Sequence, residues 1–130
     1  MKNILFISGC MAAASLLFSC KDEHLHNDHE APVISIASPV EDAVYAAGDT
    51  IRVQGTVSDN EDLHELLIQL RMGGTVVYSE TPEVHGLQSF GIDARFPVEG
   101  SMVPGSAHVI VIASDHSENV DSVRIGVILQ

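Results

Sequence analysis

Histidine is the residue type in this chain whose number and spacing could do chemistry. Seven His stand against no Trp and two Tyr in 130 residues. Imidazole nitrogens bind Zn, Cu and Ni well, and three or four of them on separate loops of a rigid scaffold make a metal centre. Such a centre requires a fold that brings several of them together. The seven positions are His24, His26, His29, His64, His85, His108 and His116.

The elements that would position these side chains are β-strands. From Pro32 onward, short runs of alternating apolar and polar residues are separated by Gly, Pro, Asn and Asp, which is typical of an all-β sandwich. Residues 63–72 also fit a helical face, but their alternation favours a strand that turns back at Gly73-Gly74. Residues 107–114 are largely apolar, as expected of a central strand covered on both sides. The predicted strands are 33–38, 50–58, 63–72, 75–80, 88–96, 107–114 and 120–129. Seven strands predict an immunoglobulin-like β-sandwich over residues 32–130.

In such a sandwich the strand order decides which loops share a pole. The start of the first strand lies at the same pole as the connections that follow the second, fourth and sixth strands. Six of the seven His fall in these segments. We expect His64, His85 and His116 to form the organised metal site, and His24, His26 and His29 to capture or hand over metal. His108 should lie at the opposite pole. The alternative is that these His are ordinary polar surface residues and that the N-terminal segment is a solvated acidic spacer.

Acidic residues share these loops. Asp59, Asp62, Glu83 and Asp115 are candidate extra ligands, or partners that orient the imidazole rings. Three of them, Asp59, Asp62 and Asp115, are expected at one pole, an arrangement similar to that of calcium sites between Ig-like or cadherin-like repeats. Calcium takes oxygen ligands and would leave the histidines unexplained. We favour turn formation for these aspartates, because Asp side chains bond to their own backbone in turns.

The N-terminus has the pattern of an export signal. An apolar run of fifteen residues follows Lys2, which is shorter than the about 20 residues of a spanning helix. Leu17-Phe18-Ser19-Cys20 resembles the lipobox of bacterial lipoproteins, which implies cleavage after residue 19 and acylation of Cys20. Lys21-Asp22-Glu23 resembles the acidic export tag of surface lipoproteins in Bacteroidota. The resemblance implies a signal peptide over 1–19 and a surface-exposed position on the cell outer membrane. Residues 20–31 are predicted to be a short disordered tether, because the stretch 21–30 contains a single apolar residue and cannot bury enough surface to become ordered. The alternative is an ordinary secretory signal.

Composition excludes several classes of function. Removal of residues 1–19 leaves 111 residues with five Lys and Arg against eighteen Asp and Glu, a formal net charge of −13. Such a charge excludes nucleic acid as a natural partner and attracts cations. Cys10 would leave with the signal, so the folded part has no thiol chemistry. No nucleophile elbow, His-Glu-x-x-His motif or phosphate-binding glycine loop is present, so we do not expect an enzyme.

Several segments resemble the recurring parts of bacterial Ig-like domains. These are Pro32-Val33-Ile34-Ser35-Ile36, Gly48-Asp49-Thr50-Ile51, Val57-Ser58-Asp59-Asn60-Glu61-Asp62-Leu63, and Ala113-Ser114-Asp115-His116 with Asn119. The mature chain resembles the small histidine-rich Ig-like lipoproteins of unknown function in Bacteroidota. This resemblance implies a fold and leaves the activity open. We expect binding of Zn, Cu, Ni or a metal-bearing ligand such as haem, for acquisition, buffering or delivery to an outer-membrane partner. The alternative is a structural or adhesive module that contacts a protein or glycan without metal; the oligomeric state stays open.

Overall fold

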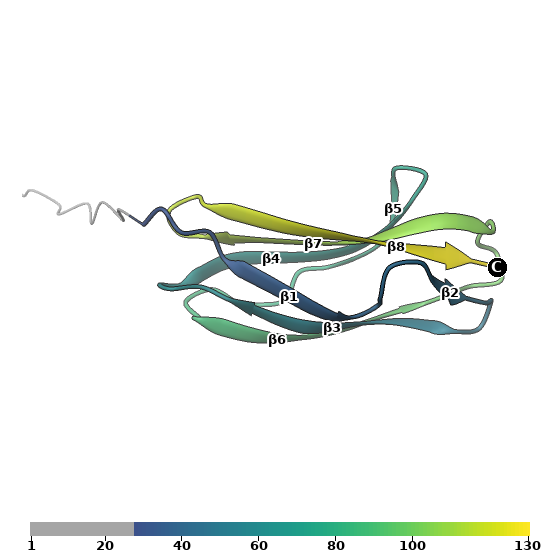
Figure 1. Cartoon of the computed structure of the whole chain (residues 1–130), viewed down its shortest axis with the longest axis horizontal. Coiled ribbons are helices and arrows are strands. Elements are labelled where there is room, and N and C mark those ends of the chain that lie inside the picture. Colours follow the sequence, from purple (N-terminus) through teal and green to yellow (C-terminus); the bar gives the residue numbers. More distant parts are fainter. Residues whose placement is uncertain (1–27) are drawn as a thin grey trace, which may run out of the picture.

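The computed structural model describes residues 28–130, and in that range every regular element is a β-strand (Figure 1). The predicted signal peptide, Cys20, His24 and His26 lie outside the described residues. The strands are β1 (Val33–Ser38), β2 (Ala43–Tyr45), β3 (Thr50–Ser58), β4 (Leu63–Met72), β5 (Thr75–Glu80), β6 (Ser89–Pro97), β7 (Gly105–Asp115) and β8 (Val120–Leu129). No helix in this range has the length and apolar character needed to cross a bilayer.

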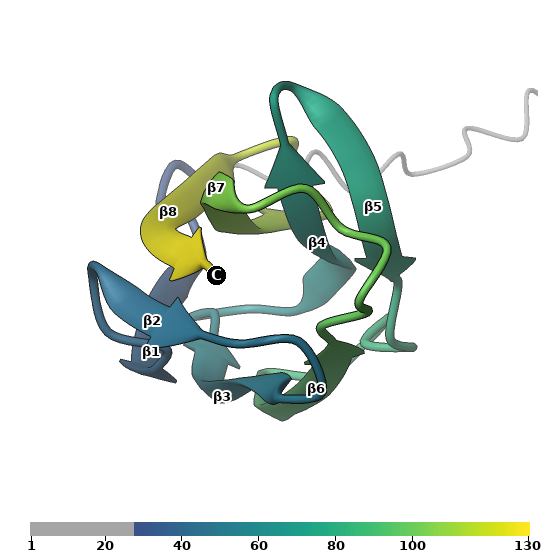
Figure 2. The same cartoon turned by 90° about the vertical axis from the view of Figure 1, so that its right-hand side faces the viewer.

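The strands form two sheets that pack face to face, as Figures 1 and 2 show from the side and from one end. One sheet has the order β1-β3-β6 and the other has the order β2-β8-β7-β4-β5. All neighbours are antiparallel except β2 and β8, which are parallel. The predicted all-β Ig-like sandwich is thereby confirmed.

The core lies between the sheets and follows from the period of two along each strand. Ile51, Val53 and Val57 of β3 are fully buried, as are Val109 and Val111 of β7 in the other sheet, and all five belong to one core cluster. The β4–β5 hairpin turns at Gly73-Gly74 as predicted, because both glycines have the positive φ that this turn requires.

Two features of the sheets differ from the sequence prediction. The structure adds β2, three residues long, where the chain leaves β1 and crosses to the edge of the other sheet beside β8. The expectation that the sixth predicted strand is covered on both sides is wrong. Along β7 fully buried side chains alternate with half-buried ones, since one face of this strand packs in the core and the other is partly exposed.

Both sheets contribute loops to the end of the sandwich where the described chain begins, at the left of Figure 1. The residues of this end are 28–32, the β3–β4 turn at 59–62, the β5–β6 connection at 81–88 and the β7–β8 turn at 116–119. We call it the N-terminal pole. The strand order thus groups the connections that the sequence predicted to share a pole.

Candidate metal centre

Three imidazole rings meet at the N-terminal pole. The ring centroids are 4.7 Å apart for His64 and His116, 4.6 Å for His85 and His116, and 5.4 Å for His64 and His85, and the rings pack edge to face. One nitrogen from each ring lies within 4.8 Å of the others, and all three side chains are exposed. We call this group the histidine trio. It contains the three residues predicted for the organised site.

A β-bulge positions His64 at the start of β4. Leu63 pairs with Asp115 of β7 and Glu65 pairs with Ser114, so His64 has no partner in the ladder. Leu63 and Leu66 are both fully buried although they are three residues apart, because the extra residue reverses the alternation between them. The bulge therefore leaves both His64 and Glu65 exposed.

A tight turn presents His85. The amide of Leu87 donates to the carbonyl of Val84 at 2.9 Å, and Gly86 adopts the φ of 76° that such a turn needs. Val84 is 1% exposed and anchors the turn in the core. The amide of Leu63 donates to the Leu87 carbonyl at 2.8 Å, which ties the turn to the start of β4. His85 is thereby held next to His64.

The β7–β8 turn carries the third ring. His116 directly follows β7, and its Nδ1 lies 3.4 Å from the carbonyl oxygen of Asp62 in the β3–β4 turn. A ring nitrogen next to a carbonyl oxygen must be the donor, and in a neutral imidazole the lone pair is then on Nε2. Backbone carbonyl groups commonly orient metal-binding histidines in this way.

The spacing of the trio is close to that of a metal site. Two nitrogens bound to tetrahedral zinc at 2.0–2.1 Å are about 3.4 Å apart. The nitrogens of the trio lie within 4.8 Å of one another. Short rotations of the exposed side chains would bring them to the separation that zinc requires. Three protein nitrogens leave the fourth zinc position open, as in sites that exchange a ligand.

The other predicted residues lie elsewhere. His29 is exposed and outside the trio, and His24 and His26 fall outside the described range. His108 pairs with Arg71 and Gly126 toward the opposite end of β7, as predicted. Glu83 accepts a hydrogen bond from the amide of His85 at 3.2 Å, so it supports the turn that carries this ring.

Asp59 and Asp115 belong to a second group, which sequence reasoning did not assemble correctly. Their partner is Asp28, whereas the calcium alternative, which we ranked below turn formation, grouped them with Asp62. One oxygen from each of the three carboxylates lies within 4.8 Å of the others. We call this group the aspartate trio. Burial raises the pKa of Asp59, and the charges of Asp115 and Asp28 act in the same direction. Hydrogen bonds from the Glu30 amide and from Asn60 hold the pKa of Asp28 below its usual value.

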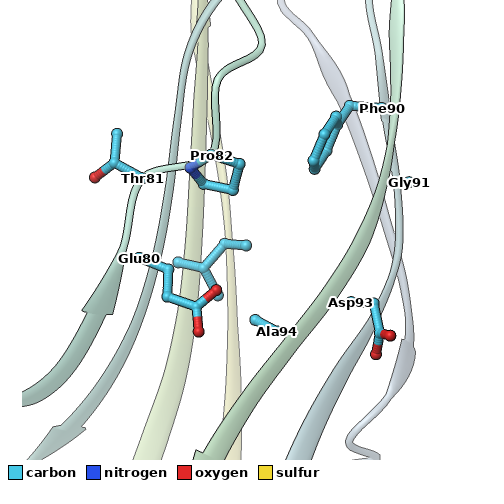
Figure 3. Close-up of a pocket in the computed structure, with 8 residues that line it drawn as sticks. Glu80, Thr81, Pro82, Phe90, Gly91, Asp93 and Ala94 are labelled. Atoms are coloured by element: carbon cyan, nitrogen blue, oxygen red, sulfur yellow. The ribbon is translucent and has the colours of Figure 1, made fainter.

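A hollow of about 490 Å³ opens between β5 and β6 at the side of the sandwich. In Figure 3 the ring of Phe90 faces Pro82, with the carboxylate of Glu80 on one side of the hollow and that of Asp93 on the other. None of the lining residues belongs to either trio. The hollow is therefore separate from the candidate metal centre.

Fold and site together define an Ig-like or fibronectin-like β-sandwich with a cluster of potential metal ligands at one pole. The chain belongs to the family described as a domain of unknown function (DUF4625), whose profile matches residues 18–127. No curated protein matches the chain.

Solved structures resemble the chain in fold alone. Fibronectin(III)-like modules of CbhA from Clostridium thermocellum align over 75% of this chain and 94% of theirs, with 17% identity and a TM-score of 0.51. An engineered protein aligns over 76% of this chain with 24% identity and a TM-score of 0.52. The chain spans only 20% of that protein's length. Both likenesses support the sandwich architecture.

Proposed function

We propose that this protein is a lipid-anchored, surface-exposed protein of the outer membrane that binds a transition-metal ion through the histidine trio. The observation that carries the proposal is the convergence of three imidazoles from three separate segments, each with a nitrogen within 4.8 Å of the others. Neutral nitrogen ligands suit Zn, Cu and Ni. Binding, rather than catalysis, is the proposed activity.

Electrostatics supports capture of cations. The predicted mature chain has a formal net charge of −13, and such a field raises the local concentration of metal ions. The trio itself consists of neutral ligands and lies among acidic loops, with Asp62 and Glu83 next to His116 and His85. An exposed site with three protein ligands also gives a second molecule access to the ion, which suits acquisition or delivery.

An anchor at Cys20 would keep this pole near the membrane. Eight residue steps separate Cys20 from Asp28, a reach of at most about 28 Å. The family profile begins at residue 18, so the matched unit includes Cys20. An acylated Cys20 would therefore keep the histidine trio close to the bilayer, where an outer-membrane partner could receive the metal. His24, His26 and His29 would be additional ligands along that path.

Calorimetry on the full-length protein tests the proposal. The protein is purified in detergent without an affinity tag, freed of metal and titrated with Zn²⁺, Cu²⁺ and Ni²⁺. We expect one ion per chain with micromolar or tighter affinity, lost when His64, His85 and His116 are changed to Ala. Because only neutral imidazole coordinates, binding should weaken as the pH falls through about 6.5.

Two variants make the result specific. His108→Ala is the matched control, since it removes an imidazole outside the trio and should bind as the wild type does. Replacement of His24, His26 and His29 by Ala measures the contribution of the N-terminal segment separately. Absence of stoichiometric heat with the wild-type protein would contradict metal binding and favour an adhesive module that contacts a protein or glycan.

A further inference from the structure

The aspartate trio joins the segment before β1 to the two turns at the N-terminal pole. Asp28 precedes β1, Asp59 begins the β3–β4 turn and Asp115 ends β7. Asp115 is 3% exposed, a degree of burial that charged side chains rarely reach without a partner of opposite charge. No Lys or Arg within residues 28–130 forms an ion pair with any of the three, since the Arg ion pairs there involve Asp93.

Turn formation explains the hydrogen bonds of Asp115 and those of one oxygen of Asp59. Oδ1 of Asp115 accepts from the amides of Ser117 and Asn119 at 2.8 Å each, and its Oδ2 accepts from the Asn119 side chain at 2.6 Å. Oδ1 of Asp59 accepts from the Glu61 amide at 3.0 Å. These bonds are the turn chemistry expected from the sequence.

Two carboxylate oxygens remain unexplained by turns. Oδ2 of Asp28 and Oδ2 of Asp59 each expose less than 1 Å² and have no hydrogen-bond partner. Oδ1 of Asp28 is bonded to the Glu30 amide at 3.0 Å and to the Asn60 side chain at 3.1 Å, so this carboxylate is held in place while its other oxygen stays unpaired. A buried anionic oxygen without a partner is costly, and two such oxygens on half-buried residues, beside the buried Asp115, favour a bound cation.

We propose that Asp28, Asp59 and Asp115 bind a calcium ion. Calcium prefers carboxylate and carbonyl oxygens at 2.3–2.6 Å, so its opposite ligands are about 5 Å apart. One oxygen from each of the three carboxylates lies within 4.8 Å of the others, so the three are close enough together to belong to a single calcium coordination shell. Magnesium demands 2.0–2.1 Å and near-ideal octahedral geometry, and zinc prefers the nitrogen ligands of the neighbouring histidine trio.

The ion would act as a clamp. Asp28 lies in the segment before β1, and the Asn119 side chain also donates to its backbone carbonyl at 3.1 Å. Calcium would join this segment to both turns and fix the direction in which the chain leaves the domain toward Cys20. The clamp does not depend on transition-metal binding, although Asp115 is adjacent to His116 in the sequence.

Thermal unfolding of the full-length protein in detergent tests this inference. Chelator-treated protein is compared in EGTA and in millimolar CaCl₂, with Mg²⁺ in excess and 150 mM NaCl as a fixed background in both. We expect calcium to raise the melting temperature and calorimetry to give one Ca²⁺ per chain. Asp59→Asn keeps an oxygen to accept from the Glu61 amide but removes one charge, so it should reduce calcium affinity at least tenfold.

Asp59→Asn should also change the melting temperature in EGTA, and here we expect an increase instead of a loss. In EGTA, Asp59→Asn removes repulsion among three carboxylates and should melt above the wild type, whereas in calcium it should gain little. Asp62→Asn, in the same turn but outside the trio, is the matched control and should respond as the wild type does. The variant without the histidine trio should keep its calcium response, so failure of the two metal proposals can be distinguished. Equal melting of the wild type in EGTA and calcium, or an unchanged calcium response in Asp59→Asn, would overturn the proposal.

Discussion

The N-terminal pole holds two groups of metal-ligating side chains that differ in charge and burial. The histidine trio consists of exposed rings that need no charge to bind a metal. The aspartate trio includes a carboxylate that is 3% exposed and two carboxylate oxygens that are buried without a partner. The two groups also differ in attachment, since the rings extend from a bulge and two turns, whereas Asp59 and Asp115 accept hydrogen bonds within their turns and Asp28 lies in the segment before β1.

This difference determines how each group affects the free energy of unfolding when no metal is bound. Exposed imidazoles are solvated, so an empty histidine trio has little effect on the free energy of unfolding. The buried oxygens of Asp28 and Asp59 lose solvation without gaining a partner, and the three carboxylates repel one another, so we expect an empty aspartate trio to oppose folding. A site for reversible capture suits the first arrangement, and a structural ion suits the second. The aspartate trio should therefore control stability while the histidine trio controls metal exchange.

The sharpest test of this division is Asp115→Ala, for which we expect the largest effect. The change removes the acceptor for two backbone amides and the Asn119 side chain in a buried position. Loss of bonds to a buried charged group should lower the free energy of unfolding by about 3 kcal/mol in EGTA, measured by urea titration. His116→Ala, one residue away, should change it by about 0.5 kcal/mol or less.

Asp115→Asn refines this prediction. Its amide oxygen can still accept from the Ser117 and Asn119 amides, so it should retain more of the stability than Ala does. If Asp115→Ala and His116→Ala destabilised the protein equally, the proposed division between a structural and an exchangeable group would be wrong.

A smaller effect is expected at Gly86, which presents His85 to the histidine trio. Its φ of 76° is unfavourable for any residue with a Cβ, so Gly86→Ala should cost about 1 kcal/mol of stability. A shifted turn would also move His85, so zinc affinity should fall several-fold in calorimetry. Gly100→Ala is the control, because a Cβ meets no atom within 4 Å at either glycine but only Gly86 has a positive φ. Unchanged zinc affinity in Gly86→Ala would show that the turn does not position the ring.

The sequence predicted the sandwich because most strands bury alternate residues, and this period is visible without coordinates. It did not predict β2, which has three residues and too few positions to show a period. The helical alternative for residues 63–72 has a physical explanation in the structure. Leu63 and Leu66 are both buried because a bulge lies between them, so a spacing of three can mark a bulge as well as a helix.

The two metal-ligating groups differed in how far the sequence could predict them. The strand order of the sandwich alone brought His64, His85 and His116 to one pole. Asp28 was missed because it lies in an acidic segment with few apolar residues, where nothing local indicates that its carboxylate contacts Asn60 and its backbone carbonyl contacts Asn119. Both contacts join residues far apart in the chain, and only coordinates reveal them.

The smallest predicted effect concerns Asp93, a carboxylate that has the cations the aspartate trio lacks. Arg52 and Arg95 lie 3.3 and 3.4 Å from its oxygens, on a surface where these side chains are about half exposed. Burial alone would raise the pKa of Asp93, but hydrogen bonds from the two Arg lower it below 3.8. Because the folded state holds the proton less tightly than the unfolded state, the stabilisation is present above pH 4 and disappears as the pH falls through the lowered value.

Asp93→Asn should therefore lower the urea midpoint slightly at pH 7, and the difference from wild type should shrink toward pH 3 and in high salt. Asp59→Asn in EGTA should shift the midpoint the other way, since its carboxylate has no cation near it. The same substitution would then have opposite signs at two aspartates of one domain, according to whether the protein itself supplies the positive charge. A decrease in stability of equal size at both positions would show that the aspartate trio is satisfied without an ion.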